Sequence, residues 1–135
     1  MTEELQINED ITADLLDRLR SGNRNERETA IEALAVSTED EDWRPGELIR
    51  QEGIETICGL LGDKNLHIVV SALNIIIATA AAGEEEALIS AGIIARLDRI
   101  QDHKDPLVSK KVREALWLLT PEVEEVITSK PQDEY

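Results

Sequence analysis

The longest apolar segment of the chain is Leu66 to Ala82, seventeen residues without an Asp, Glu, Lys or Arg. Polar residues interrupt it at Ser71, Asn74 and Thr79. The segment is therefore shorter and less continuous than the roughly 20 apolar residues that a membrane-spanning helix requires. A helix of this composition is expected to be buried on nearly every side. We predict that it forms the centre of the fold.

On both sides of this segment, apolar residues recur at helical spacing between short polar or glycine-containing breaks. The pattern predicts helices over 13–20, 25–37, 45–51, 54–61, 66–82, 84–91, 93–100 and 106–120. Gly53 and Gly92 are predicted to form the sharp turns that lead into two of these helices. Residues 1–10 are acidic and polar, and we expect them to form a tail.

The same order of elements recurs along the chain. In the three longest predicted helices, Ala30, Ala72 and Val112 align with separations of 42 and 40 residues. Three further sets align on the same offsets and complete the predicted core: Ala33, Ile75 and Ala115; Leu34, Ile76 and Leu116; Ser37, Thr79 and Leu119. Gly53 and Gly92 lie 39 apart. The sequence therefore predicts three tandem helical repeats over 11–38, 43–82 and 84–120, followed by a C-terminal extension over 121–135.

A period of about 40 residues with a short helix, a glycine turn, a helix and a long helix resembles the armadillo repeat. The resemblance is clearest in QEGIETICGLLGDKNLHIVVSALNIIIATAAAG and SAGIIARLDRIQDHKDPLVSKKVREALWLL, whose repeats are most similar to the importin-α type. The first repeat lacks the short helix and its glycine, as expected for a terminal repeat. The resemblance implies an all-α, right-handed solenoid of the armadillo or HEAT-like kind, with about three repeats.

In such a solenoid the long helices line a concave groove that serves as the binding surface. The face of each long helix opposite the predicted core supplies the candidate groove residues, with Ala35 and Ala81 beside them. The candidates are Glu28, Glu32, Val70, Asn74, Ile77, Lys110, Glu114 and Trp117. Two alternatives stay open here: the apolar members form an exposed interaction surface, or tight curvature buries them. Trp43 likewise either covers the junction between the first two repeats or is an exposed anchor.

The importin-α resemblance implies a Trp and an Asn one helical turn apart in successive long helices, which together hold an extended basic peptide. In this chain the Trp position holds Glu32, Asn74 and Glu114, and the Asn position holds Val36, Ala78 and Leu118. Because no repeat keeps the pair, recognition of nuclear signals by that mechanism is not expected.

Charge narrows the classes of partner. The chain has 29 acidic and 14 basic residues, a formal net charge of −15. This charge repels phosphate backbones and anionic lipids, so neither nucleic acid nor a membrane is an expected ligand. It favours solubility or a basic partner. The acidic start of the chain lacks the basic and apolar regions of a signal peptide, which indicates a cytoplasmic or nuclear protein.

The residues that usually support catalysis or metal binding are sparse. The single cysteine, Cys58, lies in an apolar run and is expected to be buried as a small hydrophobe. His67 and His103 have no cysteine or second histidine near them in the sequence, so we predict no metal site. The sequence has neither a phosphate-binding GxxxxGK[ST] loop nor a GxSxG elbow. We therefore expect no cofactor and no enzymatic activity.

These observations predict a protein-interaction module that captures a peptide or helix in the groove, and the acidic groove residues favour a basic one. Two alternatives remain open. One is a structural subunit or homodimer that uses the apolar strip, since Leu118, Leu119 and Val123 would leave an apolar end. The other is a chaperone cofactor resembling the armadillo-type exchange factors of the seventy-kilodalton heat-shock chaperones, which have more repeats.

Overall fold

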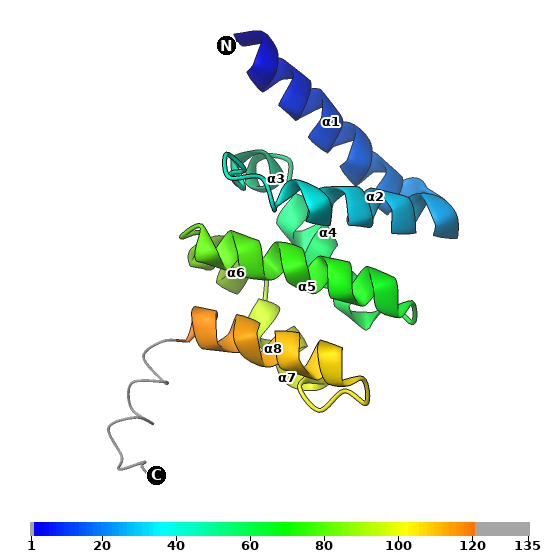
Figure 1. Cartoon of the computed structure of the whole chain (residues 1–135), viewed down its shortest axis with the longest axis vertical. Coiled ribbons are helices and arrows are strands. Elements are labelled where there is room, and N and C mark those ends of the chain that lie inside the picture. The colour runs from blue at the N-terminus through cyan, green and yellow to red at the C-terminus, as the bar shows by residue number, and fades with distance from the viewer. Residues whose placement is uncertain (1, 121–135) are drawn as a thin grey trace.

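A computed structural model describes residues 2–120, and its side chains are described from residue 11 onward. The elements are α1 (Thr2–Ser21), α2 (Arg24–Ser37), α3 (Gly46–Arg50), α4 (Gly53–Gly59), the 3-10 turn η1 (Leu60–Gly62), α5 (Leu66–Ala81), α6 (Glu85–Ser90), α7 (Ile93–Ile100) and α8 (Pro106–Leu119). The long helices α2, α5 and α8 lie side by side and run in the same direction, with α4, α6 and α7 behind them (Figure 1).

The predicted helices are present, and most of their ends agree with the structure to within two residues. The exception is the first helix, which begins at Thr2 rather than at residue 13, so that the segment predicted as a tail is helical from residue 2. The predicted C-terminal extension, residues 121–135, lies outside the described residues.

Each long helix begins with the same kind of cap. The Oδ1 atoms of Asn23, Asn65 and Asp105 accept backbone N–H bonds from the first turns of α2, α5 and α8, each at 2.9 Å. These three caps are separated by 42 and 40 residues, as the predicted core positions are. Such a side chain satisfies a backbone donor that has no partner within the helix. The caps therefore follow the repeat register at the starts of α2, α5 and α8.

The left-handed residue of the turn between α3 and α4 is Glu52, with a φ of 60°, and its counterpart before α7 is Gly92, with a φ of 80°. The prediction that Gly53 makes this turn is thus wrong by one residue. Arg20 of α1 supports the turn, since its Nη2 donates to the carbonyl oxygens of Gln51 at 2.9 Å and of Glu52 at 3.2 Å.

Gly53 is required by packing rather than by backbone conformation, because it lies buried at the first position of α4. A Cβ atom at residue 53 would lie 2.9 Å from both terminal methyl carbons of Leu16. The absence of a side chain therefore lets α1 and α4 approach each other closely.

The core is centred on α5, which packs against α2, α4, η1, α6 and α8. Most predicted core residues are buried: Ala30, Leu34, Ala72, Ile75, Ile76, Thr79, Val112, Ala115 and Leu119. The prediction is wrong for Ala33 and Ser37, which are exposed, and Leu116 is only half-buried. The reason is that α2 packs mainly against α1 and α5 and so has fewer neighbours than α5.

The outer long helices have polar residues where α5 has buried apolar ones. Leu73 is fully buried in α5, and the equivalent residue of α8, forty positions later, is the exposed Arg113. At the other end, Glu26 of α2 is exposed at the position of the buried Ile68. The expectation of an apolar end at Leu118 and Leu119 is also wrong for the described part, because Leu119 is 5% exposed and Leu118 half-buried. Val123 lies outside the described residues.

Candidate functional site

The eight predicted groove residues all lie on α2, α5 and α8, the three helices that are adjacent in Figure 1. We call this set the long-helix face. Glu32, Lys110, Glu114 and Trp117 are exposed, and Glu28, Val70, Asn74 and Ile77 are half-buried. Ala35, placed beside this face by the sequence pattern, is instead buried at 8% exposure. The face therefore combines accessible charged residues at both ends with partly accessible apolar residues in its middle.

Val70 and Ile77 lie two helical turns apart on α5, with Asn74 between them. Both apolar side chains are partly buried and pack against the core. Ala78 is also half-buried and Ala81 is exposed, so this side of α5 is accessible along much of its length. The helix that the sequence predicts to be buried on nearly every side thus has one apolar side partly open to solvent.

Trp117 is the largest exposed apolar side chain in the described part of the chain, with 56% of its surface accessible. It is equivalent to Ile77, forty residues earlier on α5. A large aromatic side chain that combines an apolar ring with an N–H donor is typical of interaction sites. The other tryptophan, Trp43, is half-buried and packs against the core, which favours its interpretation as a cover over the junction between repeats.

Charge is divided along the long-helix face. Glu28 and Glu32 lie on α2, and Lys110 and Lys111 lie on α8. Asn65 Nδ2 donates to Glu28 Oε1 at 3.0 Å, and neither glutamate has an ion pair with another described residue. The α2 end of the face is consequently acidic.

The structure also places His67, at the start of α5, beside Glu28 and Glu32. The sequence analysis did not predict this proximity, because Glu28 and Glu32 lie 39 and 35 residues before His67 along the chain. The 42-residue offset contained the signal, since it aligns His67 with Asn25, one turn before Glu28. His103 is half-buried, and its Nδ1 accepts the backbone N–H of Asp105 at 3.0 Å.

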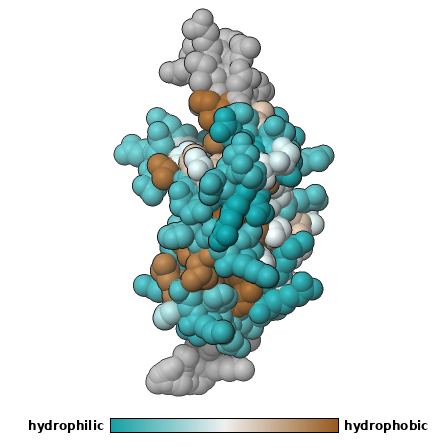
Figure 2. All heavy atoms as spheres, turned by 90° about the vertical axis from the view of Figure 1, so that its right-hand side faces the viewer, coloured by the Kyte–Doolittle hydropathy of each residue, from teal (hydrophilic) through white to brown (hydrophobic). Residues whose placement is uncertain are grey.

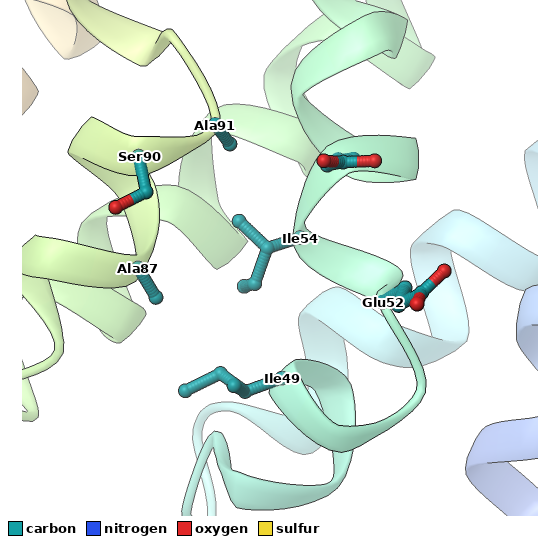
Figure 3. Close-up of a pocket in the computed structure, with 7 residues that line it drawn as sticks. Ile49, Glu52, Ile54, Ala87, Ser90 and Ala91 are labelled. Atoms are coloured by element: carbon teal, nitrogen blue, oxygen red, sulfur yellow. The ribbon is translucent and has the colours of Figure 1, made fainter.

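A different side of the molecule contains a shallow pocket of about 230 Å³ between the α3–α4 corner and α6 (Figure 3). Ile49, Ile54 and Ala87 point into it, whereas the Glu52 carboxylate points away. Its remaining lining residues are Glu55, Ser90 and Ala91. Because its centre is apolar and its polar groups do not converge, the pocket lacks the arrangement of an active site.

The side of the stack that bears the N-terminal ends of the long helices is mainly hydrophilic, with only separate hydrophobic groups (Figure 2). Leu66 and Leu107, in the first turns of α5 and α8, are 42% and 49% exposed. Scattered apolar residues of this kind are ordinary on protein surfaces. Among the residues that the structure describes, this side therefore shows no continuous apolar patch.

Cys58 is fully buried in α4. Burial raises the pKa of its thiol to about 11, with Arg96 lowering it and Glu55 raising it by smaller amounts. The thiolate is the reactive form of cysteine, so a raised pKa makes the side chain inert. Cys58 is thus a core residue, as the sequence predicts.

We expect a thiol reagent at pH 8 to label the folded protein at least about 100-fold more slowly than the urea-unfolded chain, because burial also blocks access to the thiol.

The free energy of unfolding should fall as pH rises from about 8.5 towards 11. In that window the unfolded chain loses the proton that the folded chain keeps, at a cost on the order of 2–3 kcal/mol. Urea titrations of the wild type and Cys58→Ala across this pH range measure the effect. If the free energy of unfolding falls equally steeply with pH in the two proteins, the prediction is wrong.

Within residues 2–120, no helix combines the length and the apolar composition that crossing a bilayer demands.

Comparison with known proteins identifies the fold to which this arrangement of helices belongs. No family model and no curated protein sequence matches the chain. Among solved structures, a designed armadillo repeat protein, YIII(Dq)4CqI, superimposes with a TM-score of 0.69 at 19% identity. The match covers 85% of this chain and 51% of the designed protein, so the chain spans about half the length of that structure. The chain has the all-α, armadillo-like solenoid fold.

Proposed function

We propose that this protein is a non-enzymatic interaction module that binds a peptide or helix of a partner along the long-helix face. The observation that supports it most is that 56% of the Trp117 surface is exposed. Trp117 belongs to the same long-helix face as the half-buried Val70 and Ile77. The armadillo-like fold is typical of scaffolds that bind proteins and contain no catalytic centre. Covering the exposed part of Trp117 with a ligand would contribute roughly 3 kcal/mol to the binding free energy, at about 25 cal/mol per Å² and before the entropic cost of association.

Polar residues of the face would orient the ligand. Asn74 offers an amide between the two apolar residues of α5, which suits a backbone group of an extended peptide. Glu28, Glu32 and Glu114 would attract positive charge, in keeping with the net charge of −15. We therefore favour a ligand with basic residues, in the cytoplasm or nucleus, rather than nucleic acid or membrane.

A peptide-display selection tests the proposal. Peptides selected on the wild type should lose at least about 10-fold in affinity for the double variant Ile77→Asp, Trp117→Asp, because each change places a charge in the apolar contact. Circular dichroism should show unchanged helical content. The matched control is Ile89→Asp, which makes the same change at a 47% exposed residue of α6, and it should bind normally.

Equal binding of the peptides by the double variant and the control would refute the proposed surface. If the double variant unfolds, Trp117→Asp alone decides the matter, because its exposed side chain contributes little to the core. Light scattering separates the structural alternative: a stable wild-type dimer that rejects peptides, and that Trp117→Asp dissociates, would assign the same surface to self-association.

A further inference from the structure

Three metal-ligating side chains meet between the first and second long helices. Glu28 and Glu32 of α2 and His67 of α5 each place a ligand atom so that all three lie within 4.8 Å of one another. The glutamates are separated by one helical turn, and the histidine comes from the adjacent repeat. The stacking of the repeats therefore creates a donor set that no single segment of the sequence contains.

One side chain positions two members of this set. Asn65 accepts the backbone N–H of His67 at 2.9 Å and donates to Glu28 Oε1 at 3.0 Å. The half-buried Glu28 carboxylate is thereby held while its second oxygen remains available. Glu32 and His67 are exposed, so rotation of their side chains can bring the donors within coordination distance of one ion. The hydrogen bond from Asn65 thus restrains Glu28, whereas Glu32 and His67 can adjust their side chains to a bound ion.

The cluster has negative charge without a counter-ion. The ion pairs of the described residues join Asp14, Asp63 and Glu47 to arginines, and none includes Glu28 or Glu32. Two carboxylates this close repel each other, and a bound cation would relieve the repulsion. The imidazole distinguishes the set from an ordinary acidic surface, because magnesium and calcium prefer oxygen ligands whereas zinc and its neighbours also take nitrogen.

We propose that Glu28, Glu32 and His67 form a binding site for a divalent transition-metal ion of the zinc type, with water completing the coordination. Such an ion would join α2 to α5 and so bind the folded chain in preference to the unfolded one, which raises stability by linkage. The proposal does not depend on peptide binding by the long-helix face.

Zinc and cobalt chloride are suitable probes with the intact chain. We expect one zinc ion per chain by calorimetry, a higher melting temperature in zinc, and visible absorption bands on adding cobalt. Glu32→Gln and His67→Gln should each weaken zinc binding at least about 10-fold and remove the rise in melting temperature. The matched controls are Glu114→Gln, at the position of Glu32 in the third repeat, and His103→Gln, and both should behave as wild type.

Equal zinc affinity in the wild type and both site variants would overturn the proposal, as would calcium or magnesium binding as tightly as zinc, since either result means general attraction to an acidic surface. Absence of cobalt bands in the wild type would overturn it independently of the variants. His67 is not part of the long-helix face, so loss of zinc binding in His67→Gln with peptide binding intact would separate this site from the proposed interaction surface.

Discussion

Replacing Leu73 with arginine is expected to unfold the middle of the stack, with a loss of more than about 4 kcal/mol in the free energy of unfolding. Leu73 is fully buried on α5, the helix that packs most extensively against the other helices. A guanidinium group there would lose its hydration without an acidic partner, which is among the most costly single changes in a protein. Since domains of this size are stable by about 5–15 kcal/mol, such a loss removes much of the total.

The chain provides its own comparison, because the equivalent residue on α8 is the exposed Arg113. The matched control is Val36→Arg, which places the same side chain on a long helix at a residue that is 64% exposed. It should change the free energy of unfolding by no more than about 0.5 kcal/mol. Urea denaturation followed by circular dichroism measures both variants. Similar losses in the two would show that Leu73 is not enclosed by the neighbouring helices.

Two glycines of α4 are expected to respond to alanine in opposite directions. Gly53→Ala should destabilise the protein by about 1–3 kcal/mol, because its Cβ would lie 2.9 Å from both Leu16 methyl carbons in a fully buried contact. Gly59→Ala should stabilise it by about 0.5–1 kcal/mol. Gly59 has helical dihedral angles, and a Cβ there would meet no atom within 4 Å.

Thermal and urea unfolding of the two variants side by side check this pair, and each serves as the control for the other. A third variant, Gly53→Ala with Leu16→Val, should recover part of the stability lost by Gly53→Ala alone, because it shortens the side chain that the new Cβ contacts. If Gly53→Ala is as stable as wild type, α1 does not approach α4 as closely as the structure places it.

The fold was predictable because it depends on local patterns that repeat. Spacing of apolar residues locates the helices, and the offsets of 42 and 40 residues align the repeats. The caps Asn23, Asn65 and Asp105 follow the same offsets and would have fixed the register more precisely than the glycines did. Gly53 misled the alignment because a glycine needed for close packing looks, in sequence, like one needed for a turn.

Features that depend on neighbours were less predictable. Ala33 and Ser37 match Ile75 and Thr79 in sequence position but are exposed, because α2 lacks the neighbours that enclose α5. The meeting of His67 with Glu28 and Glu32 depends on the stacking of two repeats and leaves no local pattern. The candidate groove residues could be assigned to a side of each helix, but the accessible area of Trp117 depends on its surroundings in three dimensions.

The common direction of α2, α5 and α8 has an electrostatic consequence. In parallel helices the peptide dipoles add, so one long edge of the stack collects the partial positive charge of three N-terminal ends and the opposite edge the negative charge of the C-terminal ends. An approaching chain therefore meets a field across the stack as well as along it. Such a field favours one orientation of a polar ligand before any side chain makes contact.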